Sequence, residues 1–300
     1  MKKILLIILL SFILFGCKKD DSITIIVPYG SPKLAQLYLE NSDDYQVDVV
    51  NGADPLVAAF GSSSHDVIFA PTNLGAKMYQ SKDSYQLLAT IVWGNYYLVS
   101  SEEQEFNISS LDGKRITVFG KNQTSDIILT YLLQELDIEV EITYVDSVSS
   151  AAQLFLSSQE SIVLLAEPVY SNVMSQLPQT KTIDIQELYQ SVTGKDSYPQ
   201  SGVFIKRNLE QSKILKIQND LIESIEKTNQ YPLDAAQLAV ELQMGLTSEI
   251  IASAILNSNL RYVSAKNSKE DIVSYFGLIL SMNPALIGGQ LPNDLFYNGD

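Results

Sequence analysis

The chain has 300 residues, enough for one large domain or two of ordinary size; 46% of them are hydrophobic and 18% are charged. This profile is typical of a globular protein and excludes disordered, collagen-like and multi-span membrane proteins. The formal charge of -15 disfavours nucleic acid as a partner, and one Cys and one His are too few for a zinc finger, an iron–sulfur cluster or an internal disulfide.

The N-terminus has the pattern of an export signal. Lys2 and Lys3 precede an apolar run over 4–15, which ends at Gly16-Cys17 and is shorter than the roughly 20 residues of a spanning helix. The string 14–17 (LFGC) resembles the bacterial lipobox, in which the cysteine is acylated and the bond before it is cut. We expect a signal peptide over 1–16, a lipid anchor at Cys17 and a linker over 17–21; the alternative is an ordinary signal with a chance cysteine.

Strand and helix patterns then alternate. An apolar run over 23–27 is followed by Tyr29-Gly30-Ser31-Pro32, a turn with a cap and a first-turn proline that predicts a helix. A strand over 46–50, a helix beginning at 54–55, a buried strand over 67–69 and a helix opening at 71–73 follow. A strand over 87–100 is the last element of this series. The alternation predicts an open, mostly parallel sheet with helices on both faces.

The same pattern begins again near residue 111. It predicts a strand over 115–119, a loop over 120–123, a helix over 127–136, a strand over 140–145, a helix over 148–156 and a strand over 162–165 that ends at Glu167-Pro168. After a short stretch over 202–205, helices are expected from about 212–229, 233–244, 247–257 and 269–282.

Several local strings resemble substrate-binding proteins of ATP-driven importers, in the branch that includes nitrate-, taurine-, alkanesulfonate- and thiamine-precursor-binding members. The strings are 66–73 (DVIFAPTN), 111–120 (LDGKRITVFG), 166–168 (AEP), 198–202 (YPQSG) and 283–289 (NPALIGG). The resemblance spans nearly all of the chain after the export signal.

The resemblance implies an α/β fold of the periplasmic-binding-protein-like type II, a clamshell of two lobes. Lobe one would be discontinuous, over 22–99 plus 203–300, and lobe two would be the insert over 100–202. The chain would cross between them near 98–101 and 200–203. Open parallel sheets bind ligands beyond the carboxyl ends of their strands, so a ligand is expected where the two lobes face each other.

The candidate ligand-binding residues lie in loops that would meet in this cleft: Tyr29, Gly30, Ser31, Thr72, Asn73, Trp93, Gly94, Gly120, Lys121, Thr124, Ser125, Glu167, Tyr198 and Gln200. Backbone N–H groups at a helix start can hold an anionic group, and Tyr29 can cover a flat ligand; the alternative is plain helix capping by Ser31. Glu167 can receive a ligand N–H, or else a hydrogen bond from a neighbouring loop. Trp93 can stack on a ligand or lie in the core.

These patterns indicate capture of a small molecule outside the cytoplasmic membrane and its delivery to an importer's permease and ATPase by a monomer. Arginine occurs only at 115, 207 and 261, none of them placed in the expected cleft, which favours a flat organic ligand with few charges over an inorganic anion. No catalytic residue, metal or cofactor is assigned. The alternatives are an enzyme on the same scaffold, related to thiamine-precursor synthesis, and a surface sensor or adhesin.

Overall fold

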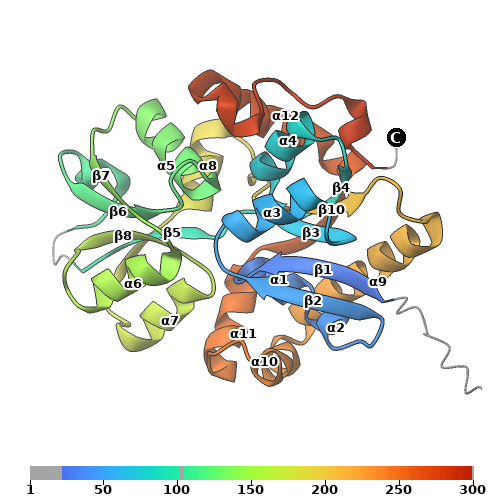
Figure 1. The fold of residues 1–300 in the computed structure, drawn as a ribbon. Coiled ribbons are helices and arrows are strands. Elements are labelled where there is room, and N and C mark those ends of the chain that lie inside the picture. The colour runs from blue at the N-terminus through green and yellow to red at the C-terminus, as the bar shows by residue number, and fades with distance from the viewer. Residues whose placement is uncertain (1–21, 102–104, 299–300) are drawn as a thin grey trace, which may run out of the picture.

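The computed structural model describes residues 22–101 and 105–298, arranged as two lobes (Figure 1). The predicted signal peptide, Cys17 and the linker lie outside the described residues. The α/β, two-lobed fold predicted from the sequence is confirmed.

Lobe one is built on a six-stranded sheet in the order β11-β4-β10-β3-β1-β2. Its strands are β1 (Ile23–Pro28), β2 (Tyr45–Val50), β3 (Val67–Pro71), β4 (Tyr85–Val92), β10 (Ser201–Lys206) and β11 (Leu260–Ser264). Its helices are α1 (Ser31–Ala35), α2 (Leu37–Glu40), α3 (Asp54–Ser62), α4 (Thr72–Ser81), α9 (Gln211–Gln230), α10 (Pro232–Glu241), α11 (Ser248–Asn257) and α12 (Ala265–Met282), with 3-10 helices η2 (Pro284–Ile287) and η3 (Asp294–Phe296).

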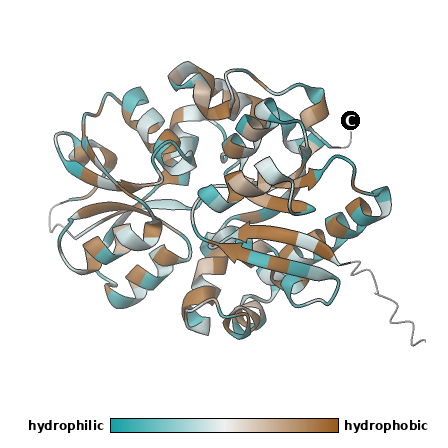
Figure 2. Cartoon of the chain, in the orientation of Figure 1, coloured by the Kyte–Doolittle hydropathy of each residue, from teal (hydrophilic) through white to brown (hydrophobic). Residues whose placement is uncertain are grey.

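The side chains along the strands of lobe one point alternately to the two faces of the sheet and form a separate hydrophobic core on each face. Ile25 and Val27 of β1 pack with α1, α2 and α9–α11 on one face, whereas Ile26 packs with α3, α4 and α12 on the other. Successive side chains of a strand point to opposite faces, so a run of apolar residues is what a sheet covered on both sides requires. Figure 2 shows these hydrophobic strands inside the helical layers.

Lobe two is built on a five-stranded sheet in the order β7-β6-β8-β5-β9. Its strands are β5 (Tyr96–Ser100), β6 (Arg115–Phe119), β7 (Glu141–Val145), β8 (Ile162–Ala166) and β9 (Lys181–Asp184). Its helices are η1 (Ile108–Leu111), α5 (Thr124–Glu135), α6 (Val148–Leu156), α7 (Val169–Gln176) and α8 (Ile185–Thr193).

The strand pairing is mixed, which corrects the expectation of mostly parallel sheets. In lobe one, β1 is parallel to β2 and β3, but β10 runs antiparallel to β3 and β4, and β11 antiparallel to β4. In lobe two, β5 runs antiparallel to β8 and β9. The strands β5 and β10 each follow a crossing from the other lobe and run antiparallel to both of their neighbours, whereas β11 runs antiparallel to β4 without following a crossing.

The chain changes lobes earlier than the sequence pattern indicated. The single strand expected over 87–100 is wrong: β4 ends at Val92 in one sheet and β5 begins at Tyr96 in the other. The first crossing is therefore 93–95, before the expected 98–101. The return lies between Thr193 and Ser201, mostly before the expected 200–203.

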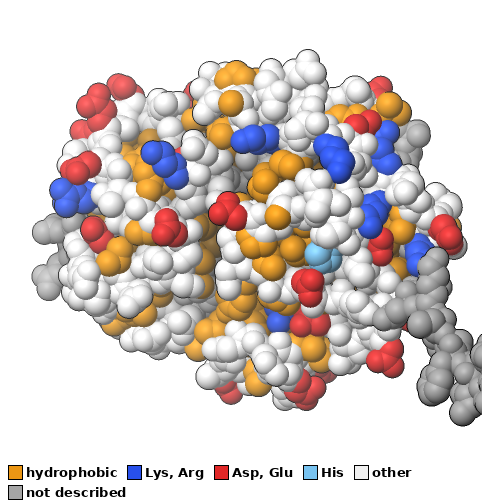
Figure 3. Space-filling view, in the orientation of Figure 1, with side chains coloured by type: hydrophobic (Ala, Val, Ile, Leu, Met, Phe, Trp, Pro, Cys, Tyr) orange, Lys and Arg blue, Asp and Glu red, His pale blue; other side chains and the backbone are white. Residues whose placement is uncertain are grey.

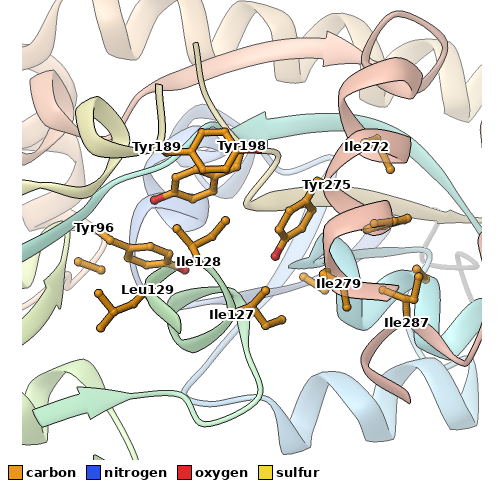
Figure 4. Close-up of a cluster of buried hydrophobic side chains, with 14 of the residues drawn as sticks. Tyr96, Ile127, Ile128, Leu129, Tyr189, Tyr198, Ile272, Tyr275, Ile279 and Ile287 are labelled. Atoms are coloured by element: carbon orange, nitrogen blue, oxygen red, sulfur yellow. The ribbon is translucent and has the colours of Figure 1, made fainter. Parts of the chain in front are cut away.

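A hydrophobic cluster joins the two lobes beside these crossings (Figure 4). Ile127 and Ile128 of α5 and Tyr198 of the second crossing gather with Tyr275 and Ile279 of α12, all of them buried. Among the described residues, the hydrophobic cores extend from Ile23 of β1 to Tyr297, so we expect residues 22–300 to fold as a unit.

Candidate functional site

A cavity of about 190 Å³ lies where the two lobes face each other. Figure 3 shows a furrow between the lobes on one face of the molecule, with hydrophobic side chains along its lower part. The cavity is lined by residues that follow the carboxyl ends of β1, β2, β6, β7 and β8, where the following helices begin. This is the position at which open α/β sheets bind ligands.

The loop between β1 and α1 forms one side of the cavity. Gly30 has φ 125° and ψ −155°, a backbone conformation that a residue with a Cβ rarely adopts. A Cβ there would stand 3.7 Å from the carbonyl oxygen of Glu167, so the loop comes close to lobe two. The Tyr29 hydroxyl donates to the carbonyl oxygen of Met244 (3.0 Å), which fixes its ring at the cavity, and burial raises the Tyr29 pKa.

A chain of buried hydrogen bonds connects this loop to both crossings. Asn95 is 2% exposed; its Nδ2 donates to Ser31 Oγ (2.5 Å), and its Oδ1 accepts from Gln200 Nε2 (2.8 Å). Ser31 Oγ in turn donates to Ser258 Oγ (2.9 Å). Asn95 belongs to the first crossing and Gln200 to the second, so one amide ties the two connections to the cavity wall.

Lobe two supplies the opposite side of the cavity. Phe119 ends β6, and the Tyr96 ring meets it edge-on with centroids 5.9 Å apart. Ser147 lies at the start of α6, where its Oγ accepts from the backbone N–H of Ser150 (3.1 Å). The cavity is thus walled largely by aromatic rings and helix starts.

Glu167 spans the gap between the lobes. Its Oε1 accepts from Ser171 Oγ (2.8 Å) within lobe two and from Asn257 Nδ2 (3.1 Å) in lobe one, and its Oε2 accepts from the Ser171 backbone N–H (3.2 Å). Burial raises the Glu167 pKa to about 7, although all three of these hydrogen bonds act to lower it. Helix α7 packs against α11 at the same place.

Six of the residues predicted from the sequence line the cavity: Tyr29, Gly30, Ser31, Gly120, Glu167 and Gln200. They come from four separate loops, which the topology brings to one point. Gly120 has φ 71° and leads into α5.

The other predicted residues have different surroundings, and none of them lines the cavity: Thr72, Asn73, Trp93, Gly94, Lys121, Thr124, Ser125 and Tyr198. Thr72 Oγ1 donates to the carbonyl oxygen of Pro199 (2.5 Å), and Thr124 Oγ1 donates to Asn73 Oδ1 (3.3 Å) across the two lobes. Ser125 Oγ donates to the Phe119 carbonyl oxygen (2.7 Å).

The aromatic and basic candidates Trp93, Tyr198 and Lys121 also contact other parts of the protein and do not line the cavity. Trp93 is buried, its Nε1 donates to the Arg261 carbonyl oxygen (3.1 Å), and the Arg261 guanidinium lies 4.6 Å from its ring centroid. Tyr198 is fully buried and stacks on Tyr96 at 6.0 Å. Lys121 holds its ammonium 5.0 Å from the Tyr144 ring.

Other residues of the lining were not assigned to the site from the sequence. Asn95, Tyr96, Phe119 and Gln123 belong to this group, with the segments 51–53 and 146–149. The signal for most of them is the rule already applied to Tyr29: each segment follows the carboxyl end of a strand, here β2, β6 or β7.

The charge of the lining is negative. Among its described residues it contains Asp146 and Glu167 and no Lys, Arg or His. Arg115 and Arg207 pair with Glu141 (3.3 Å) and Asp83 (2.6 Å) instead. A doubly charged inorganic anion would find no counter-charge here.

Metal ligation and membrane spanning have little support in the described part of the chain. Over 22–101 and 105–298 no three residues of the types His, Cys, Asp and Glu gather in a way that could hold a metal ion. No helix in the same residues combines the length and the apolar character that crossing a bilayer requires. His65 contacts Ser64 Oγ (2.7 Å) and Asp48 (3.0 Å) and does not line the cavity.

Comparisons with known proteins agree with this geometry. A family model described as menaquinone biosynthesis matches residues 76–271. An ABC transporter structure from Parabacteroides distasonis is 23% identical with a TM-score of 0.80, covering 93% of this chain and 99% of that one. The periplasmic aliphatic sulphonate binding protein from Escherichia coli is 15% identical with a TM-score of 0.67, covering 91% and 92%.

A Candida albicans protein described as having the generic periplasmic binding protein fold is 11% identical with a TM-score of 0.58, covering 91% of this chain and 99% of that one. No curated protein matches the sequence. At these identities the likenesses show the fold, so the predicted resemblance to importer substrate-binding proteins is confirmed at that level.

Proposed function

The chain belongs to the menaquinone biosynthesis family, and from the fold that it shares with importer binding proteins we propose that it is a solute-binding protein. It captures a small organic molecule outside the cytoplasmic membrane and delivers it to the permease and ATPase of an ABC importer. The observation that carries this proposal is the cavity between the lobes, which Tyr29 lines from one side and Phe119 from the other. Binding in such a position favours the closed arrangement of the lobes.

The proposed ligand contacts are the lining residues Tyr29, Gly30, Ser31, Gly120, Glu167 and Gln200, joined by Asn95, Tyr96 and Phe119. The aromatic side chains suit a flat organic molecule, and the absence of a cation from the described lining disfavours an inorganic anion. The protein acts as a monomer and needs no cofactor or metal for this role.

The proposed location is the outer face of the cytoplasmic membrane. The pattern around Cys17 supports a lipid anchor, and each buried CH₂ of the acyl chains contributes about 0.8 kcal/mol to anchoring. Labelling with an alkyne-bearing fatty acid tests the anchor: wild type takes up the label, and Cys17→Ser does not.

A second candidate function is an enzyme on the same scaffold. The family description names a biosynthesis, and the cavity contains Glu167, whose pKa of about 7 suits a general acid or base. Glu167→Gln separates the two functions. An enzyme loses turnover of a bound molecule with this change, whereas a binding protein returns the same molecule unaltered.

Native mass spectrometry of residues 22–300, purified without denaturation, tests the proposal. We expect a population carrying one small organic molecule, which is lost or reduced when Phe119→Trp fills the cavity from lobe two. Leu177→Trp, at an exposed position outside the lining, is the matched control. A protein that carries nothing and is not stabilised by any member of a metabolite panel contradicts the proposal.

A further inference from the structure

A second hollow adjoins the cavity at the boundary between the lobes. We call it the groove; it holds about 470 Å³ and shares Tyr29, Ser149 and Val169 with the cavity lining. From there it continues between α6 and α7 of lobe two and reaches Leu246 of lobe one. The cavity and the groove therefore lie side by side, with these three residues common to both linings.

The lining of the groove contains no charged residue among those described. Ala152, Leu156, Val169 and Leu246 give it an apolar surface, and Gln153 lies at an exposed position on α6. An apolar groove gains free energy by covering hydrocarbon, at about 25 cal/mol per Å² of apolar surface removed from water.

The size of the cavity supports the same conclusion. At about 190 Å³ it falls below the range of roughly 300–1,000 Å³ that is usual for small-molecule sites. The groove, at about 470 Å³, lies within that range and adjoins the cavity. A ligand confined to the cavity would leave this apolar extension uncovered.

Several polar groups of the cavity are occupied within the protein, whereas Gln200 Oε1 is a buried acceptor without a hydrogen-bond partner. Asn95 is bonded to Ser31 and Gln200, and the Glu167 carboxylate to Ser171 and Asn257. With no cation in the described lining, an anionic ligand group would be buried without a counter-charge.

We propose that the ligand is an elongated molecule without an anionic group, with a flat aromatic end between Tyr29 and Phe119 and a hydrocarbon chain along the groove beside α6. This inference rests on the proposed function, since it names the class of molecule that the site takes.

Isothermal titration calorimetry with a series of para-alkylphenols tests the inference on residues 22–300. From para-ethylphenol to para-hexylphenol we expect binding to tighten roughly fourfold per added methylene, which corresponds to about 0.8 kcal/mol per buried CH₂. The matching para-alkylbenzoates, of equal length but anionic, are expected to bind at least tenfold more weakly.

Gln153→Glu places a charge in the groove at an exposed position outside the cavity lining. We expect it to abolish most of the gain per methylene and to leave para-ethylphenol within twofold of wild type. Gln159→Glu, an exposed change of the same charge outside both linings, is expected to keep the wild-type series.

The inference would be overturned by affinity independent of chain length, by para-alkylbenzoates that bind as tightly as the phenols, or by a chain-length gain that survives Gln153→Glu. Absence of binding by the whole series overturns it as well. The proposed function is judged separately, by the native mass spectrum, because a short or anionic molecule that co-purifies would preserve that function and exclude this ligand class.

Discussion

Glu167 connects the two lobes through one carboxylate, which accepts from Ser171 in lobe two and from Asn257 in lobe one. Burial raises its pKa from the ordinary 4.5 to about 7. Between these two pH values the folded protein holds a proton that the unfolded chain releases. The contribution of this group to the free energy of unfolding therefore falls as pH rises from about 4.5 to about 7 and stays low above that.

Glu167→Gln removes this titration. We expect the free energy of unfolding of wild type, minus that of Glu167→Gln, to fall by a few kcal/mol between about pH 4.5 and about pH 8. Urea unfolding at a series of pH values measures it, and the subtraction removes the contribution of the other carboxyl groups. Parallel profiles for the two proteins would show that the Glu167 pKa is the same in the folded and unfolded states.

Asn95 is a buried polar residue of the cavity wall whose side chain is bonded to Ser31 and Gln200. Asn95→Ala leaves both partners without these bonds, and we expect it to lower the free energy of unfolding by about 2–4 kcal/mol. Asn267→Ala, exposed on α12, should stay within about 0.5 kcal/mol of wild type. Equal stability of the two variants would contradict the assigned hydrogen bonds.

At this scale the sequence located loops better than individual side chains. The rule that ligands bind beyond strand ends found Tyr29, Gly120 and Glu167, because it depends on chain order. It also selected Thr72 and Ser125, which instead donate to nearby carbonyl oxygens. The hydrogen-bond partner of a hydroxyl group depends on which residues lie nearby in the tertiary structure. A strand–helix pattern in the sequence does not predict these neighbours.

The elements show where a continuous hydrophobic pattern misleads. Residues 87–100 read as one strand because β4 and β5 are both buried on two faces, and the break between them is three residues long. The residue in the sequence that indicates a break between the two strands is Gly94, which has φ 79° in the crossing. Its position is also crowded, since a Cβ would stand 2.9 Å from Gln186 Oε1 and 3.0 Å from the Tyr198 ring.

Gly94→Ala should therefore destabilise the protein, by about 1–3 kcal/mol, because the left-handed backbone and the contact with Tyr198 both oppose a side chain. Gly61→Ala is the matched control: this glycine lies in α3, has open space around its Cβ position, and should gain about 0.5–1 kcal/mol. Thermal unfolding compares the two. A neutral Gly94→Ala would mean that the crossing adopts another backbone.

For the whole molecule, the two-lobed fold followed from repeated strand–helix units and from the resemblance of their strings to a known family. The mixed strand pairing could not be predicted, because a hydrophobic run does not indicate the direction of a strand. In addition, β10 lies between two strands that are distant from it in sequence. The contacts of Glu167 with Asn257 and of Thr124 with Asn73 close the lobes on each other. They join the two lobes beside the cavity.

The most direct test of the binding site is a crystal structure of the protein with its co-purified molecule retained. We predict density for one organic molecule that touches Tyr29 of lobe one and Phe119 of lobe two. Density for the co-purified molecule on the outer surface of a single lobe, with only solvent between Tyr29 and Phe119, would contradict the account.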